Sequence, residues 1–284
     1  MINNNTKPKD AAYFTAFEAE IATDSLPQKL NSPFGNDLSA IGLLAVEQLQ
    51  EYLIKQTDWV HNFGLDKTMT GEIIGKMFGV LVVKTEANEV GYLAAFSGKL
   101  AGRNQHLKFV PPIFDSLQKD SFLTVGMNKL AEINSEIKAL QSNKLINNEL
   151  AIDTLKNLRK SNSNALQNKL FDHYYFLNQA GESKSLRTIF KQYTHRQPPT
   201  ASGECAAPKL LQHAFQHNMT PLAIAEFWWG ASPKSAIRQH KQFYPACQEK
   251  CAPILKHMLE DLGDGTNSSS CICLVYPIFT SKTP

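Results

Sequence analysis

The sequence lacks a long apolar run and lacks an excess of charge of either sign. The N-terminal stretch MINNNTKPKDAAYF has no apolar segment after its charged residues, and the longest uncharged apolar stretch, SSSCICLVYPIF, is shorter and more polar than the roughly 20 residues that cross a bilayer. Because 29 basic residues face 26 acidic ones, the net charge is only +3, and any nucleic-acid contact must depend on a local patch. We therefore expect a soluble, cytoplasmic protein.

Signatures of several common enzyme classes are also missing. There is no P-loop, no dinucleotide-binding glycine fingerprint and no G-x-S-x-G nucleophile elbow. What remains is a chain of 284 residues with 43% hydrophobic residues, long enough for one large domain or two small ones. Its five cysteines are an odd number, and without a signal peptide they are better interpreted as thiols or metal ligands in a reducing cytoplasm than as disulfides.

Hydrophobic periodicity divides the chain into five segments. Residues 1–37 form a polar lead-in with little periodic signal. In residues 38–125, the spacing of apolar residues predicts a helix over 38–56, with Asp37 as its N-cap, and strands over 77–84 and 90–97 form a β-hairpin. The first of these strands is apolar almost throughout, which is typical of a strand that is covered on both faces. Residues 263–284 are an atypical tail that follows the last predicted helix.

The two remaining segments, residues 126–180 and 181–262, differ in their pattern of apolar residues. Residues 126–180 place apolar side chains at three-four-three spacing and predict an inserted helical hairpin, which is either an arm that contacts a partner or RNA, or a packing brace. Residues 181–262 contain a helix after Glu204, a strand that ends at Gly230 and a final helix that stops at Gly263. The resulting order predicts an α/β fold, a small sheet flanked by helices and similar to the cytidine-deaminase-like fold.

Three cysteines have a spacing that suits a metal site. Cys247 and Cys251 are four residues apart, so on a helix their sulfur atoms would share one face. Cys205 lies at the start of the preceding helix, and this layout resembles that of the zinc deaminases, with their H-x-E and later P-C-x-x-C signature. We expect zinc as the metal, with His213, His217, His240 or a water molecule as the fourth ligand. The alternative is that these are small buried thiols.

The neighbouring glutamate, Glu204, is a candidate catalytic acid or base. It departs from the deaminase pattern, because it precedes Cys205, whereas the glutamate of that signature follows the first ligand by two residues, where this chain has Ala207. On a helix, Glu204 would point about 100° away from Cys205. The spacing C-x-x-x-C is also one residue longer than in the motif. Separately, Glu226, Trp228 and Trp229 at a strand end either line a pocket or close the core.

A short basic and aromatic cluster follows that strand. Basic side chains that can neutralise phosphate stand beside rings that can stack on a base, so the cluster is a candidate RNA-binding patch, or else a solvated loop. The patch comprises Lys234, Arg238, His240, Lys241, Phe243 and Tyr244.

Several blocks of sequence together carry a family resemblance. They are DWVHNFGL (58–65), GKMFGVLVV (75–83), GYLAAFSGKLAG (91–102), FVPPIFD (109–115), GECAAPKLLQHAFQH (203–217), AEFWWGASPKSAIRQHK (225–241) and FYPACQEKCAPILKHML (243–259). Over residues 38–262 the chain resembles the N-terminal region that precedes the catalytic domain in extended bacterial RluA-type RNA pseudouridine synthases. The resemblance implies an accessory, RNA-binding role in uridine modification of rRNA or tRNA.

The same resemblance implies no isomerase activity for this chain. The family's chemistry needs an aspartate in an H-R-L-D type motif, whereas the only His-Arg pair here, His195 and Arg196, continues with Gln197 and Pro198. Because the sequence changes character after Leu262, we expect a truncated or frameshifted relative that keeps only the accessory region. A zinc-dependent deaminase-like hydrolase that acts on a nucleobase is the alternative function.

Overall fold

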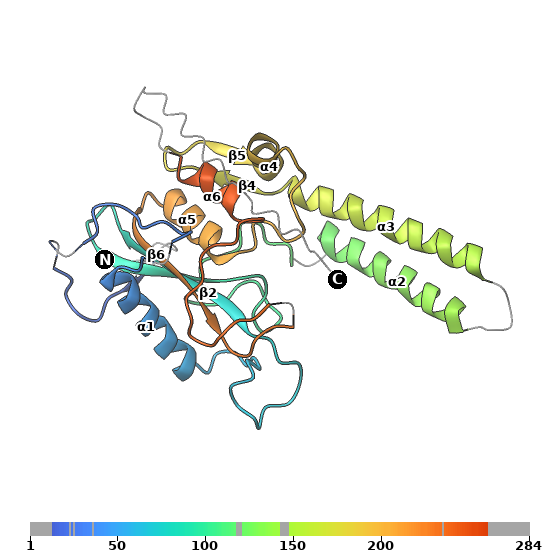
Figure 1. Cartoon of the computed structure of the whole chain (residues 1–284), viewed down its shortest axis with the longest axis horizontal. Coiled ribbons are helices and arrows are strands. Elements are labelled where there is room, and N and C mark those ends of the chain that lie inside the picture. Colours follow the sequence, from blue (N-terminus) through green and yellow to red (C-terminus); the bar gives the residue numbers. More distant parts are fainter. Residues whose placement is uncertain are drawn as a thin grey trace, which may run out of the picture.

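The computed structural model describes residues 13–22, 24, 26–35, 37–117, 121–142, 148–234 and 236–260. Over these residues the chain is an α/β protein with a small antiparallel sheet and six helices (Figure 1). The main sheet has the strand order β1-β3-β2-β6, and a second sheet of two short strands, β4 and β5, lies apart from it. No helix within the described ranges is long and apolar enough to cross a membrane.

The predicted β-hairpin is the centre of the main sheet. β2 (Lys76–Lys84) pairs antiparallel with β3 (Val90–Phe96), so that Leu81 lies opposite Leu93. On its other side β2 pairs antiparallel with β6 (Thr220–Trp229). β2 is therefore an inner strand of the sheet, and its residues 78–83 are buried, as its apolar run predicts.

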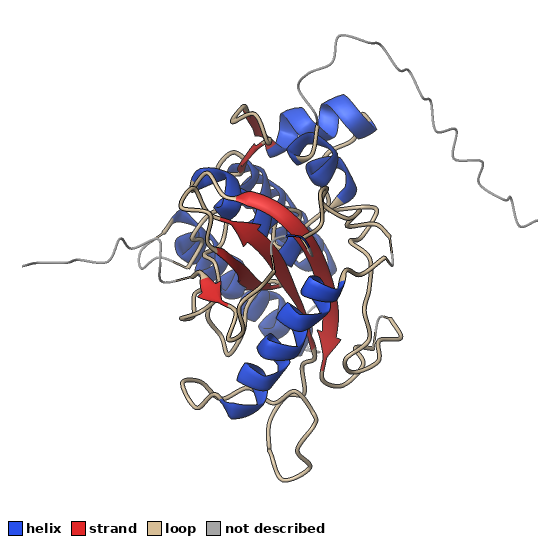
Figure 2. Ribbon diagram, turned by 90° about the vertical axis from the view of Figure 1, so that its left-hand side faces the viewer, coloured by secondary structure: helices blue, strands red, loops and turns tan. Residues whose placement is uncertain are grey.

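Helices cover both faces of this sheet (Figure 2). On one face α1 (Ala40–Lys55) packs on the side chains of Phe78, Val80 and Val82. On the other face α5 (Ala206–Gln216) and α6 (Ala252–Met258) share a core with Leu81 and Val83. Successive strand side chains point to opposite faces, which is why alternate residues of β2 belong to different cores.

The first helix begins slightly later than its predicted cap. Ser39, and not Asp37, is the N-cap of α1, because its Oγ accepts a hydrogen bond of 3.2 Å from the backbone N–H of Gly42. Such a cap contributes about 1 kcal/mol to helix stability. The predicted helix itself is confirmed over residues 40–55.

Part of the polar lead-in belongs to the folded sheet. β1 (Thr15–Ala16) pairs with β3, and the side chain of Asn31 exchanges two hydrogen bonds of 2.8 and 2.9 Å with the backbone of Ile224 in β6. Backbone groups and one amide hold this segment, so its sequence needs no apolar periodicity. The lead-in thus occupies part of the free edge of β6.

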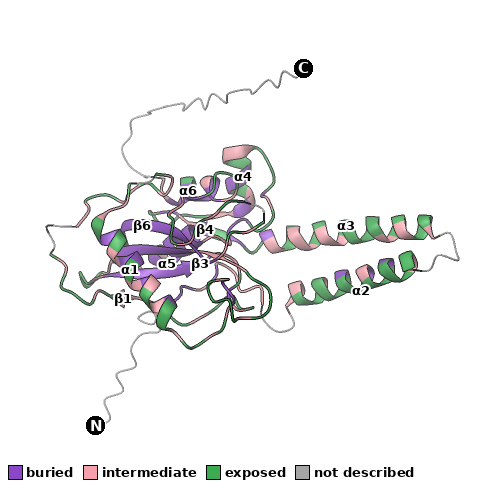
Figure 3. Ribbon diagram, turned by 60° about the horizontal axis from the view of Figure 1, so that its bottom comes forward, coloured by how far each residue is buried: buried purple, intermediate pink, exposed green. Residues whose placement is uncertain are grey.

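The inserted segment contains two long helices, α2 (Phe122–Ser142) and α3 (Glu149–Phe171). They pack against each other and project from the rest of the chain, and most of their surface is exposed (Figures 1 and 3). The side chains of Leu130, Ile133 and Ile137, which the spacing placed on one face, are the buried residues of α2. The helices approach closely at Gly126, where an added Cβ atom would lie 2.5 Å from Leu166.

Between the helical pair and α5, the chain forms elements that the sequence did not predict. β4 (Tyr175–Leu177) and β5 (Ser183–Ser185) form the second sheet and lead into α4 (Leu186–Thr194), which packs on α6. Strands of three residues are too short to carry a clear alternation of polar and apolar side chains. The tail over 263–284 lies outside the described residues.

Candidate functional site

The start of α5 brings Cys205 to the centre of the site. Cys205 is the N-cap residue, with extended backbone, but its side chain makes no capping hydrogen bond. A carboxylate from the sheet supplies that bond instead, because Oε1 of Glu226 accepts from the backbone N–H of Ala207 at 3.3 Å. The helix start can sit this close to the sheet because Gly79, opposite Glu226 in β2, has no side chain: a Cβ there would lie 3.0 Å from Ala206.

The three predicted cysteines lie together. The Sγ atoms of Cys205, Cys247 and Cys251 are all within 4.8 Å of one another, close enough to bind one metal ion, and those of Cys247 and Cys251 are 3.4 Å apart. Cys251 is buried in the core beneath α5, while Cys247 is exposed. Among the described residues, these three side chains are the group that could hold a metal.

The local geometry of the last two cysteines differs from the prediction. Cys247 lies before α6, and Cys251 is the N-cap residue of that helix, so the pair spans a turn and not a helical face. The backbone N–H of Ala252 donates to the carbonyl of Cys247 at 3.1 Å and closes the turn. Pro253 favours this start, because proline fits the first helical turn and breaks a helix that extends before it.

Of the three cysteines, Cys247 is the one whose surroundings favour the thiolate form. Hydrogen bonds from Cys205 and Cys251, together with backbone N–H groups of Lys250 and Cys251, lower the pKa of the Cys247 thiol. The same thiol–thiol bonds raise the pKa of Cys251, and the bond with Cys247 raises that of Cys205 to about 12. The three thiols thus share protons, and only one of them is favoured as a thiolate. A metal ion could take the place of the shared protons and stabilise all three thiolates, since thiolates are the form that binds metals.

Histidine does not complete the cysteine cluster. His213 is eight residues along α5 from Cys205, roughly 12 Å at the helical rise, and its ring packs on those of His217 and Tyr13. The ring of His240 packs on Trp229, and its Nδ1 accepts a hydrogen bond of 3.0 Å from the backbone N–H of Gly230. Of the predicted fourth ligands, a water molecule is therefore the one consistent with the arrangement.

Glu204, the predicted catalytic residue, is engaged elsewhere. The hydroxyl of Tyr174 donates a hydrogen bond to Oε1, and Nζ of Lys209 lies 3.6 Å from Oε2. Lys209 is only 2% exposed, and its Nζ also donates to the carbonyl of Phe96 at 3.1 Å. Burial lowers the pKa of Lys209, while the charges of Glu204 and Cys205 oppose that shift. The contacts of Glu204 are those of a residue that fixes α5 to the segment after α3.

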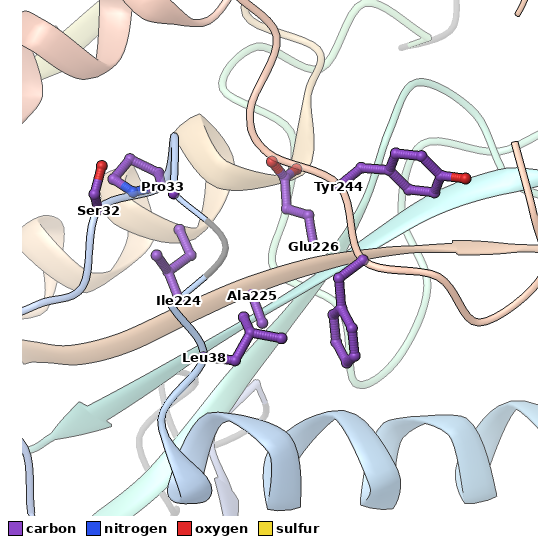
Figure 4. A pocket seen from close by; sticks show the side chains of 9 residues that line it. Ser32, Pro33, Leu38, Ile224, Ala225, Glu226 and Tyr244 are labelled. Carbon is purple, nitrogen blue, oxygen red and sulfur yellow. The ribbon is translucent and has the colours of Figure 1, made fainter. Parts of the chain in front are cut away.

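Glu226, which the sequence predicted either to line a pocket or to close the core, has a carboxyl that contacts the start of α5. Its side chain stands on the face of β6 away from α1 (Figure 4), and it is 9% exposed. Burial, with a smaller contribution from the negative charge of Cys247, raises the pKa of the Glu226 carboxyl to about 7. The hydrogen bond to Ala207, two residues after Cys205, places the carboxyl at the start of α5. The available signal was a carboxylate inside an otherwise apolar strand.

A small pocket opens next to Glu226 at the edge of β6. It lies between the lead-in segment and the chain after β6, and Figure 4 shows most of the side chains that line it. The lining residues are Ser32, Pro33, Gly35, Leu38, Ile224, Ala225, Glu226, Phe243 and Tyr244. Glu226 therefore forms part of the wall of this pocket.

The predicted RNA patch borders this pocket. The backbone N–H of Tyr244 donates to the carbonyl of Glu226 at 3.0 Å, and residues 241–244 continue the sheet beyond β6. The guanidinium of Arg238 lies over the Tyr244 ring, 4.1 Å from its centroid, and its charge lowers the pKa of Glu226. Lys234 and Lys241 are exposed, and Phe243 packs against the core on the α1 side. The predicted RNA patch and the residues at the end of β6, which the sequence analysis treated separately, thus lie next to each other at Glu226.

Comparison of the chain with protein-family models, with curated proteins and with solved structures finds no match. The geometry of the described residues is therefore the basis for a functional assignment.

Proposed function

We propose that this protein is a zinc-binding module of RNA modification that binds rRNA or tRNA in the cytoplasm and does not itself isomerise uridine. The observation that carries the proposal is that Glu226 links two groups of residues. Its carboxyl contacts the start of α5, where Cys205 belongs to the group of three thiols, and its backbone pairs with Tyr244, on which Arg238 stacks. Such a role agrees with the resemblance to the region that precedes the catalytic domain in RluA-type pseudouridine synthases.

Zinc is the metal that fits this donor set. Tetrahedral zinc with Zn–S bonds of about 2.3 Å separates its thiolates by about 3.8 Å, and the observed sulfur atoms lie within 4.8 Å, the closest pair at 3.4 Å. Soft thiolates favour zinc over magnesium or calcium. Three thiolates and one zinc carry a net charge of −1, and the ammonium group of Lys209, four residues after Cys205 on α5, offsets it.

The order of elements also supports the proposal of a cytidine-deaminase-like fold with an inserted helical hairpin. A helix, a β-hairpin, a helix, a strand and a helix follow one another, with the α2–α3 pair between the hairpin and α5. The cysteines come from the starts of α5 and α6, as in the zinc deaminases.

RNA binding at the patch is testable with its exposed lysines. We expect Lys234→Gln combined with Lys241→Gln to weaken binding of single-stranded RNA about tenfold and to reduce the slope of log affinity against log salt by about 1.4, because each phosphate contact contributes about 0.7. Fluorescence anisotropy with a labelled oligouridylate measures both. Arg238 stays unchanged, since its stack on Tyr244 shapes the pocket.

The matched control is Lys67→Gln with Lys99→Gln, which removes the same charge from exposed positions outside the patch. Equal weakening by both pairs would show a response to net charge and count against the patch. Wild-type protein that binds no RNA at any salt concentration would contradict the proposed function as a whole.

A specific observation favours a second candidate, a zinc-dependent hydrolase that acts on a nucleobase. The buried carboxyl of Glu226 lies beside the cysteines and at the wall of a pocket, which is the relationship a proton-transferring group requires. Zinc held by three protein ligands supplies Lewis-acid activation of water or of a substrate. In this chain Glu226 would take a proton from the attacking water and pass it to the leaving amino group.

The hydrolase candidate can be tested with one glutamate variant, and a second glutamate variant serves as the control. If ammonia is released from cytidine, adenosine or a cytosine-containing oligoribonucleotide, Glu226→Gln is expected to reduce the rate by at least about a hundredfold while zinc is retained. Glu204→Gln, measured at a temperature where that variant is folded, is expected to retain the rate. A rate that depends on Glu204 and not on Glu226 would reject this assignment.

A further inference from the structure

A second cationic surface lies on α4, away from the cysteines in the sequence and unassigned by the resemblance. A concavity there is formed by the exposed side of α4 and by the turn that ends it. The lining residues are Arg187, Thr188, Lys191, His195, Arg196 and Gln197. His195 ends the helix in the left-handed region, at φ of 56°, and so directs Arg196 and Gln197 back along the helix.

The guanidinium of Arg187 is held in place before any ligand binds. Its Nε donates to Oδ1 of Asp172 at 2.6 Å, and one terminal nitrogen donates to the carbonyl of Asn168 at 2.8 Å. The other terminal nitrogen lies 3.4 Å from Oε1 of Gln197. A guanidinium has five N–H donors, so two stay available to an anion, and its position costs little further entropy on binding.

Two further cations complete the concavity. Lys191 follows Arg187 by four residues on α4 and therefore lies on the same face, and Arg196 follows the helix end. Lys191 and Arg196 are exposed, so their charges are available to a ligand. Arg187, Lys191 and Arg196 carry three positive charges, and Asp172 carries one negative charge, so the local charge is +2. The net charge of the whole chain is +3. The surface favours an anion with more than one charge.

An aromatic ring stands at the N-terminal end of α4, the end at which Arg187 lies. Tyr175 of β4 pairs with Ser185 of β5, the N-cap residue of α4, and the Tyr175 side chain is 53% exposed. Arg187 lies two residues after that cap. Proteins bind single-stranded nucleic acid by combining exposed rings, which stack on bases, with cations along the same surface, which contact phosphates.

We infer that this concavity, which we call the α4 site, binds the phosphate backbone of single-stranded RNA and that Tyr175 stacks on one of its bases. The inference rests on the proposed function, since it adds a second point of contact for the same RNA. The α4 site contacts phosphates through Arg187, Lys191 and Arg196.

The test uses the full-length protein and a short fluorescein-labelled oligouridylate, with anisotropy measured between about 50 and 200 mM salt. Lys191→Gln with Arg196→Gln is expected to weaken binding about tenfold and to lower the salt slope by about 1.4. Both side chains are exposed, and Arg187 keeps its contact with Asp172, so the fold is preserved. Tyr175→Ala is expected to weaken binding about tenfold with the salt slope unchanged.

Lys67→Gln with Lys99→Gln again serves as the matched control. Wild-type binding that is unaffected by Lys191→Gln with Arg196→Gln overturns the α4 site but leaves the proposed function in place. Absence of RNA binding by the wild-type protein overturns both. Loss of binding with Lys191→Gln and Arg196→Gln but not with Tyr175→Ala, together with equal binding of heparin, identifies a general polyanion surface and overturns the assignment to RNA.

Discussion

The purified protein is expected to contain one zinc ion per chain, and Cys247→Ser is expected to reduce the content to less than about a tenth of that. Loss of one of three thiolate ligands leaves a site that competes poorly with buffer and chelators. Cys247 is the best position for the change, because it is exposed and its replacement removes a ligand without opening the core. Metal analysis by mass spectrometry after gel filtration gives the ratio.

Removal of zinc is also expected to lower thermal stability. A ligand that binds only the folded state at 1,000 times its dissociation constant stabilises that state by about 4 kcal/mol. For a chain of this length, 1 kcal/mol shifts the melting temperature by about 2–4 °C, so a chelator is expected to lower it by about 10 °C. The core around Cys251 includes Ile254 and Leu255 of α6, and this helix is expected to lose protection from hydrogen exchange first.

The chain provides its own control for the zinc experiment. Cys271 and Cys273 are the two other cysteines, and Cys271→Ser with Cys273→Ser makes the same chemical change at positions outside the three-cysteine group. Zinc content that falls with this pair and persists in Cys247→Ser would place the metal elsewhere. Wild-type protein with no zinc after expression in zinc-supplemented medium would refute the site.

The sequence predicted those features that depend on a local pattern. The apolar run of β2, the apolar segment of β6 that ends at Gly230 and the three-four-three spacing of α2 are each a property of neighbouring residues, and each element was found where expected. The three cysteines were also predicted as a group, because thiolates at the starts of successive helices converge when those helices pack on one sheet face. Cys247 lies outside the helix in which its spacing to Cys251 predicts it, because Pro253 favours a helix start at Cys251.

Features that depend on contacts between distant residues were not predictable in this way. The two hydrogen bonds between Asn31 and Ile224 join residues 193 apart in the sequence and leave no periodic signal. The roles of the two glutamates depend on position in three dimensions as well. Glu226 faces the start of α5 because β6 lies next to β2 at Gly79, whereas Glu204 is turned toward Lys209 and Tyr174.

Glu204→Gln is expected to destabilise the protein by about 3 kcal/mol. The replacement keeps an oxygen that can accept from Tyr174, but it removes the charge that faces the buried ammonium group of Lys209. Breaking a buried pair at one partner typically costs about 3–5 kcal/mol, because an uncompensated charge stays in the interior, and the partial exposure of Glu204 puts the expected value at the lower end. Urea denaturation followed by circular dichroism measures the change.

A double-mutant cycle separates this pairing from simple loss of packing. Lys209→Met keeps most of the side-chain volume, and when combined with Glu204→Gln it is expected to recover at least about 1 kcal/mol relative to Glu204→Gln alone, because the buried ammonium group that has lost Glu204 is then also removed. Additive effects of the two changes would mean that Glu204 and Lys209 act independently, and the structural role assigned to Glu204 would then be wrong.

The pH dependence of the single variant gives an independent check with a defined sign. Burial lowers the folded-state pKa of Lys209, and without Glu204 the remaining groups that face it, Cys205 and Lys76, leave that pKa lower still. Between the folded pKa and the unfolded value of about 10.4, the unfolded chain binds more protons, so stability rises with pH. The deficit of Glu204→Gln relative to the wild type is therefore expected to shrink as the pH rises from 7 toward 10. A deficit that grows over this range would mean that Lys209 is not the group that Glu204 stabilises.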